Sequence, residues 1–175
     1  MAKIILKNVR ISFPSLFKKA VFNGEETGFE GTFLLDKDTQ ADQIESIQAQ
    51  IKELIKTNLK GAKLGPDKLC LRDGDLVEYD GYANHFSLKA SSKKRPLVID
   101  RDKSPLVEDD GRPYSGCYVN ASIELWAQDN NYGKRINATL LGVQFFKDGE
   151  PFGDGSSGSV NDFDAFGDDE SDDVF

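Results

Sequence analysis

Residues 118–127 of this 175-residue chain read Tyr118-Val119-Asn120-Ala121-Ser122-Ile123-Glu124-Leu125-Trp126-Ala127. Successive side chains of a β-strand point to opposite faces, so every second residue shares a face. One face of this stretch is entirely apolar, whereas the other carries Tyr118, Asn120, Ser122, Glu124 and Trp126. The pattern predicts a long strand with one face in a core. It places the only Trp of the chain among polar residues, where the ring can stack on a nucleic-acid base, pack under a loop or contact another subunit.

Other segments have the same strand character. The first, residues 4–17, puts Val9, Ile11 and Phe13 on one side and is expected to end at Pro14. The others are residues 28–35, 76–79, 82–90, 97–99 and 135–146, and residues 129–134 link the last two long strands as a hairpin. Twisted antiparallel strands with one helix between the early ones predict a mainly β (α+β) domain, built as a small barrel or a strongly bent sheet.

The one amphipathic helix follows the second strand. Apolar residues recur there at spacings of three and four and form a single stripe: Ile44, Ile47, Ile51, Leu54 and Ile55. Asp38 or Thr39 is expected to cap its start, and Gly61 suits its end. We expect the stripe to pack against the sheet, and we expect residues 61–75 to form a loop.

Charge is segregated along the chain. The whole chain has 22 basic and 30 acidic residues, but residues 148–175 hold ten acids and no Lys or Arg. The body that remains is slightly basic, with 22 basic and 20 acidic residues. We therefore expect a folded domain at residues 1–152 and a disordered acidic tail at residues 153–175. A polyanionic arm beside a basic body can compete for a surface that binds polyanions, which makes nucleic acid the first partner to consider.

Basic residues interleaved with aromatic residues supply the candidate binding site. One cluster lies in the first twenty-two residues, a second at residues 89–103, and a third at the tip of the last hairpin. The candidate DNA-binding residues are Arg10, Lys18, Lys19, Lys89, Lys93, Lys94, Arg95, Arg101, Tyr118, Trp126, Tyr132, Lys134 and Arg135. A single strand fits better than a duplex, because no basic recognition helix is present and stacking needs exposed bases.

Catalytic patterns are weak by comparison. His85 has no neighbouring His or Cys, and Cys70 and Cys117 lie far apart, so we expect reduced thiols and no metal or cofactor. Asp73 and Asp75 could hold a metal ion in a nuclease, but Asp-Gly-Asp is also an ordinary turn. We expect a binding protein rather than an enzyme. No stretch approaches the roughly 18 apolar residues of a membrane span, and the start lacks the pattern of a signal peptide, so no membrane partner is expected.

Several short strings occur in a recognisable order. They are residues 8–17 (NVRISFPSLF), 33–37 (FLLDK), 71–75 (LRDGD), 95–96 (RP), 116–121 (GCYVNA) and 142–145 (GVQF), followed by 148–152 (DGEPF). With them, nearly the whole chain resembles the phage-encoded single-stranded-DNA-binding proteins first catalogued as a domain of unknown function.

The resemblance implies an OB-type antiparallel barrel and non-sequence-specific binding of single-stranded DNA during phage DNA replication, recombination and repair. It also implies a location in the cytoplasm of an infected bacterial host. The acidic end is similar to the tails of other single-strand binders, which recruit replication proteins. The tail residues expected to do so are Asp168, Asp169, Glu170, Asp172, Asp173 and Phe175.

Two other functions stay open on the sequence. One is a DNA-mimicking inhibitor whose acidic arm occupies the nucleic-acid channel of a host protein. The other is the metal-dependent nuclease that would use Asp73 and Asp75. The oligomeric state, the site size and the choice between DNA and RNA are not fixed by any motif.

Overall fold

The computed structural model describes residues 2–152 of the chain. The tail residues predicted to bind partners, and the predicted disorder of residues 153–175, lie outside this range. The elements are β1 (Ala2–Phe22), β2 (Glu25–Asp36), α1 (Ala41–Asn58), β3 (Leu71–Asp73), β4 (His85–Ser92), β5 (Leu97–Ile99), β6 (Tyr118–Asn130) and β7 (Gly133–Lys147), with short 3₁₀ turns at Pro66–Lys68, Gly74–Leu76 and Glu108–Asp110.

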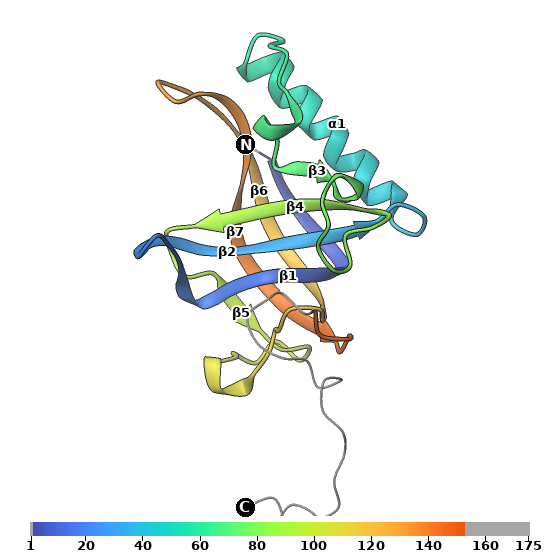
Figure 1. Cartoon of the computed structure of the whole chain (residues 1–175), viewed down its shortest axis with the longest axis vertical. Helices are drawn as coiled ribbons and strands as arrows, with labels where there is room; N and C mark the ends of the chain where they lie inside the picture. Colours follow the sequence, from blue (N-terminus) through green and yellow to red (C-terminus); the bar gives the residue numbers. More distant parts are fainter. Residues whose placement is uncertain (1, 153–175) are drawn as a thin grey trace, which may run out of the picture.

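The strands close into a barrel (Figure 1). Their order is β3-β4-β2-β1-β6-β7-β5, and β4 also pairs with β7 through Ser91 and Thr139. That last pairing joins β1, β2, β4, β7 and β6 in a closed ring of five strands, to which β3 and β5 are added. Pairings in the ring are antiparallel apart from the parallel β4–β7 contact. The predicted mainly β, OB-type barrel with one helix is confirmed.

The alternation of apolar residues determines which side chains fill the barrel. Val119, Ala121, Ile123 and Leu125 of β6 are all 2% exposed or less, as the sequence predicts. They meet the inward residues of β2 and β7, such as Phe33 and Leu140, in one core cluster. Trp126 lies on the outer face of β6, also as predicted.

Burial rather than capping holds α1 in place. Ile44, Ile47, Ile51 and Leu54 are buried in the same core cluster as the barrel strands. Fully burying such a side chain contributes roughly 1.5–3 kcal/mol, whereas an N-cap contributes typically about 1 kcal/mol. The predicted cap by Asp38 or Thr39 is wrong. The N-cap is Gln40, and its side chain makes no cap hydrogen bond; it binds the carbonyl oxygens of Lys7 and Asn8 instead.

Three other expectations were wrong. β1 does not end at Pro14 but continues to Phe22, because a register shift between Ser12 and Ser15 accommodates a residue that has no amide hydrogen. Residues 76–79 form no strand, since residues 74–76 are a 3₁₀ turn and a loop follows. The expected loop at residues 61–75 contains the short strand β3. Cys70 and Cys117 are free thiols, as predicted.

Candidate nucleic-acid interface

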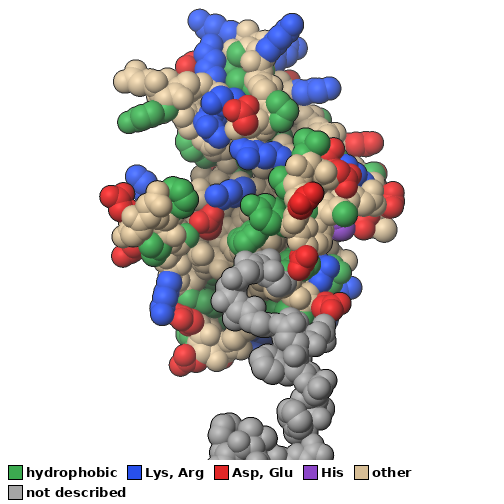
Figure 2. Space-filling view, in the orientation of Figure 1, with side chains coloured by type: hydrophobic (Ala, Val, Ile, Leu, Met, Phe, Trp, Pro, Cys, Tyr) green, Lys and Arg blue, Asp and Glu red, His purple; other side chains and the backbone are tan. Residues whose placement is uncertain are grey.

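A groove of about 640 Å³ crosses the outer face of the barrel over β2, β4 and β7. On this face, Lys and Arg side chains border a hollow that has hydrophobic side chains at its edge (Figure 2). The groove is lined by Phe13, Thr32, Leu69, Cys70, Arg72, Asp73, Val77, Tyr79, Tyr82, Ser87, Lys89, Ser91, Trp126, Gln128, Arg135, Asn137, Ala138 and Thr139. In OB-type barrels, the face of the second and third strands with its flanking loops is where oligonucleotides bind; here those strands are β2 and β4.

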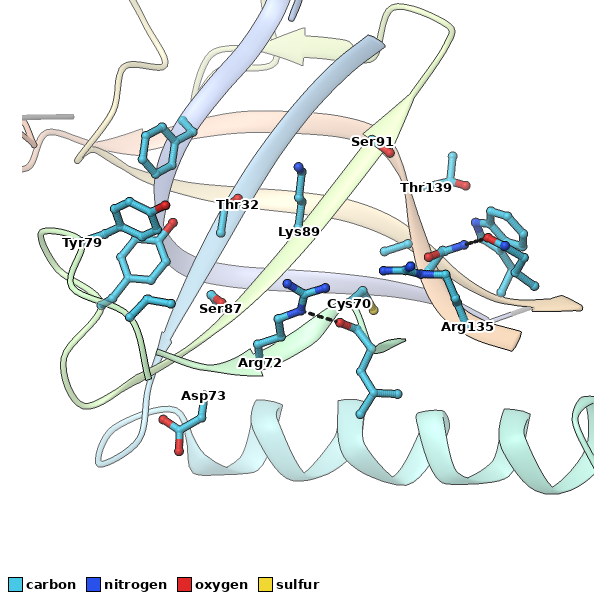
Figure 3. Close-up of a pocket in the computed structure, with 18 residues that line it drawn as sticks. Thr32, Cys70, Arg72, Asp73, Tyr79, Ser87, Lys89, Ser91, Arg135 and Thr139 are labelled. Carbon is cyan, nitrogen blue, oxygen red and sulfur yellow. Dashed lines mark hydrogen bonds between the residues drawn. The ribbon is translucent and has the colours of Figure 1, made fainter. Parts of the chain in front are cut away.

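One end of the groove is aromatic (Figure 3). The rings of Phe13 and Tyr79 meet edge to face with centroids 5.2 Å apart, and Tyr79 meets Tyr82 at the same distance. The alternation of β1 predicted Phe13 on the core face with Val9 and Ile11, and that is wrong. Phe13 has φ +50° at the register shift of β1, which turns its side chain outward and leaves it 38% exposed.

The loop of residues 74–84, hereafter the groove loop, presents Tyr79 and Tyr82. Its base is tied by Lys37, whose Nζ lies 2.7 Å from Oδ1 of Asp73 and 2.7 Å from Oδ2 of Asp75. The backbone N–H of Asn84 donates to Oδ1 of Asp75 at 2.8 Å, and this hydrogen bond joins the two ends of the loop. Hydrogen bonds from the Lys37 ammonium lower the pKa of Asp73, and those from the Asn84 amide and from Lys37 lower that of Asp75.

This ion pair also bears on the nuclease alternative. The ammonium of Lys37 occupies the position between Asp73 and Asp75 that a metal ion would need. Within residues 2–152, no three His, Cys, Asp or Glu side chains are grouped as metal ligands. The two carboxylates are therefore structural groups that hold the groove loop.

Three cationic side chains line the groove, and two of them are fixed by the same carbonyl group. Arg72 and Arg135 each donate from Nη2 to the carbonyl oxygen of Asp67 at 2.9 Å. Lys89 projects from β4, and its Nζ lies 3.1 Å from Oε2 of Glu30. Figure 3 shows Arg72 and Lys89 toward the middle of the groove and Arg135 at the end away from Tyr79. Such a row can contact successive phosphates of a single strand.

The end of the groove near β6 and β7 carries the Trp. Trp126 is paired across the sheet with Asn137, and Gln128 with Arg135. The Asn137 amide donates to Oε1 of Gln128 at 2.8 Å. Hydroxyl groups from Thr32, Ser87, Ser91 and Thr139 complete the floor, so the groove offers uncharged hydrogen-bonding groups between its cations and its rings. Cys70 also lines the groove. Burial raises the pKa of this thiol to about 11, so the thiol is uncharged at neutral pH.

The structure brings some of the predicted residues together. Lys89, Trp126 and Arg135 line the groove. Tyr132 and Lys134 are exposed at the tip of the β6–β7 hairpin beside Arg135. The exposed residues Lys93, Lys94 and Arg95 follow the groove residue Ser91 in the loop after β4.

Other predicted residues lie away from the groove. Lys18 and Lys19 are exposed on the far part of β1, and Lys18 pairs with Glu108 at 3.2 Å. The Arg101 guanidinium lies 5.5 Å from the ring centroid of Phe146, near the end of β7. Tyr118, at the start of β6, is flanked by Arg10 and Lys147. Arg10 donates to the carbonyl oxygens of Gly116 and Glu150, at 2.8 and 2.6 Å.

Sequence reasoning missed Arg72, Tyr79 and Tyr82 as groove residues. Arg72 belongs to a strand of only three residues, which is too short for alternation to assign a face. The two tyrosines were assigned to strands, although the Gly and Asp residues between them, at 80–81, are a turn signal. That signal, with two aromatic rings beside it, would have indicated an aromatic loop.

Comparisons with known proteins identify relatives of this chain. A family model described as "Enterobacter phage Enc34, ssDNA-binding protein" matches residues 2–175. Protein p50 of Acyrthosiphon pisum secondary endosymbiont phage 1 is 48% identical over 177 residues, which cover 93% of this chain and 92% of that protein.

Two solved structures are similar to the fold. The single-stranded DNA-binding protein from bacteriophage Enc34 superposes with a TM-score of 0.79 at 35% identity, covering 93% of this chain and 90% of the other. The same phage protein in complex with ssDNA gives a TM-score of 0.79 at 33% identity, covering 87% of this chain and 90% of the other.

Proposed function

This chain belongs to the family of the Enterobacter phage Enc34 ssDNA-binding protein, and from this premise we propose that it holds single-stranded DNA in the groove over β2, β4 and β7. The family's function is binding rather than catalysis. The observation that carries the proposal is one continuous groove with aromatic rings at both ends and three cationic side chains along it. Rings can stack on bases of any sequence, and cations contact the repeating phosphates, so binding is expected without sequence preference.

A single strand suits this groove better than a duplex. Stacking of a base on an aromatic side chain contributes on the order of 1–3 kcal/mol per base, but a duplex keeps its base faces covered. Tyr79 and Trp126 lie at opposite ends of the groove, so the strand would pass Arg72 and Lys89 between two stacking positions. On this basis the protein would protect and organise single-stranded DNA during phage DNA replication, recombination and repair, in the cytoplasm of the infected host.

The acidic tail has two proposed roles. Residues 148–175 hold ten acids and no Lys or Arg, and this concentration of negative charge supports competition with DNA for the cations of the groove. Asp168, Asp169, Glu170, Asp172, Asp173 and Phe175 would recruit replication proteins when DNA displaces the tail.

A gel-shift titration at two salt concentrations tests the proposed function. We expect the protein to bind a single strand more tightly than a duplex of equal length and to lose affinity as salt rises. No binding to either DNA at any salt would contradict the proposal and favour the DNA-mimicking inhibitor. Cleavage of the single strand on addition of magnesium would favour the nuclease.

A further inference from the structure

Phe152 contacts the groove loop but does not line the nucleic-acid groove. A Cβ atom added to Gly81 would collide with Cζ of Phe152, so the ring lies directly against the loop backbone. Gly81 has φ +82°, a conformation that glycine adopts without strain. Gly81 lies between Tyr79 and Tyr82, the two loop residues whose rings line the groove. It directly precedes Tyr82 and is two positions after Tyr79.

Arg10 also contacts the ring of Phe152. Its guanidinium carbon lies 4.1 Å from the ring centroid, which is within the range of a cation–π contact. Two hydrogen bonds fix the guanidinium itself, from Nε to the Gly116 carbonyl at 2.8 Å and from Nη2 to the Glu150 carbonyl at 2.6 Å. We call Arg10, Gly81 and Phe152 the clasp.

The segment that carries Phe152 is anchored independently of the loop. The Phe152 amide donates to the Ser115 carbonyl at 3.1 Å. The Tyr114 hydroxyl donates to Oδ1 of Asp148 at 2.8 Å and accepts from the Gly149 amide at 3.1 Å. The position of Phe152 is thus set by its contacts with residues 114–115 and not by the groove loop.

The groove loop contains a tight turn at its middle, where the Tyr82 backbone amide donates to the Tyr79 carbonyl at 3.2 Å. Its base is tied by Lys37 and Asn84, and Tyr82 is only 4% exposed although it lies outside the core cluster of the barrel. Tyr79 is 55% exposed, and its ring meets those of Phe13 and Tyr82. Because Gly81 belongs to the same turn as Tyr79, a shift of the backbone at Gly81, which Phe152 contacts, would move the Tyr79 ring.

We infer that Arg10 and Phe152 are positioning residues for DNA binding, which act through the groove loop by holding Tyr79 where a base can stack on it. This inference rests on the proposed function and changes the role of Arg10. The sequence pattern made Arg10 a candidate DNA-binding residue, whereas its guanidinium is directed at two carbonyl groups and the Phe152 ring. Neither clasp side chain lines the groove itself.

The test combines single and double variants with oligo-dT affinity measured over a range of salt. Loss of a stacked base weakens binding about fivefold to 150-fold. Phe152→Ala displaces the Tyr79 ring without removing it, so its loss of affinity is expected near the lower end of this range. Because the clasp acts through Tyr79, Phe152→Ala should have no further effect in a Tyr79→Ala background. Gly81→Ala, whose Cβ would collide with the ring, should weaken binding as Phe152→Ala does.

Salt dependence separates positioning from phosphate contact. A side chain that neutralises one phosphate of a single strand contributes about 0.7 to the slope of log affinity against log salt. Arg10→Met should weaken binding and leave this slope unchanged. Phe146→Ala is the matched control, because it removes a ring stacked with an arginine, Arg101, at a place that does not touch the groove loop.

The outcomes are distinct. A slope reduced by about 0.7 in Arg10→Met would show a direct phosphate contact and overturn the inference. Additive effects of Phe152→Ala and Tyr79→Ala, or wild-type affinity in the clasp variants, would overturn it as well. Phe152→Leu keeps bulk against Gly81 and should retain most of the affinity, which guards against a general folding defect. If the wild-type protein itself does not bind oligo-dT, the proposed function fails instead.

Discussion

Replacing Trp126 by Ala should weaken the binding of single-stranded DNA without unfolding the protein. Trp126 lies on the outer face of β6, is partly buried at one end of the groove, and does not belong to the core cluster. Truncating a core aromatic residue destabilises a protein by about 3–5 kcal/mol. A smaller loss is expected here, because the ring packs on the outside of the barrel.

The size of the binding effect follows from the geometry. The partly buried ring has one side against the sheet, where Asn137 is its cross-strand partner, so it can stack on one base. One lost stack costs about 1–3 kcal/mol, or about fivefold to 150-fold in Kd. Since no charge is removed, the dependence of affinity on salt should stay as in the wild type.

Fluorescence anisotropy of a labelled oligo-dT measures this change directly, and Phe146→Ala is the matched control. Phe146 is a partly buried aromatic residue on the neighbouring strand β7, but it lies outside the groove. Trp126→Phe should retain much of the affinity because a ring remains. An equal loss in Phe146→Ala, or wild-type affinity in Trp126→Ala, would refute the assignment of the groove.

Three further predictions concern charge. Lys89→Met should lower the slope of log affinity against log salt by about 0.7, and Lys56→Met on the exposed side of α1 should not, as salt titrations will show. Deleting residues 161–175 should tighten oligo-dT binding at low salt, with the gain shrinking as salt screens the tail; unchanged or weaker binding would count against tail competition. The lowered pKa of Asp75 means that its ionised form stabilises the fold above its ordinary pKa of 3.8, a contribution lost as pH falls through the lower folded value. Thermal melts should therefore show a Tm that drops in acid, and the drop should be smaller in Asp75→Asn; an equal drop would argue that its pairing with Lys37 does not matter for stability.

Short-range patterns in the sequence predicted most of the barrel. Alternation alone assigned the two faces of β6 and placed Trp126 outside the core, because the period of a strand leaves no freedom once one face is buried. The spacing of Ile44, Ile47, Ile51 and Leu54 likewise predicted α1 and its buried stripe. Closure of the barrel between β4 and β7 rests on a contact between distant segments, which no local pattern encodes.

The candidate site was predicted less completely, because it combines residues that a charge pattern cannot separate. Lys89 and Arg135 were identified by charge and do line the groove. Arg10 has the same charge, but only its partners in the folded chain show that it points at carbonyl groups. Phe13 illustrates the opposite error, since a positive φ at one residue reversed the face that alternation had assigned.

The central claim is that a single strand lies along the groove between the groove loop and the β6–β7 hairpin. Ultraviolet crosslinking of the full chain to oligo-dT, followed by mass spectrometry of the crosslinked peptides, tests it most directly. We predict crosslinks at Tyr79 and Trp126, at the two ends of the groove. Crosslinks concentrated instead at Tyr118 and Phe146 would place the DNA at the other end of β6 and β7 and contradict the account.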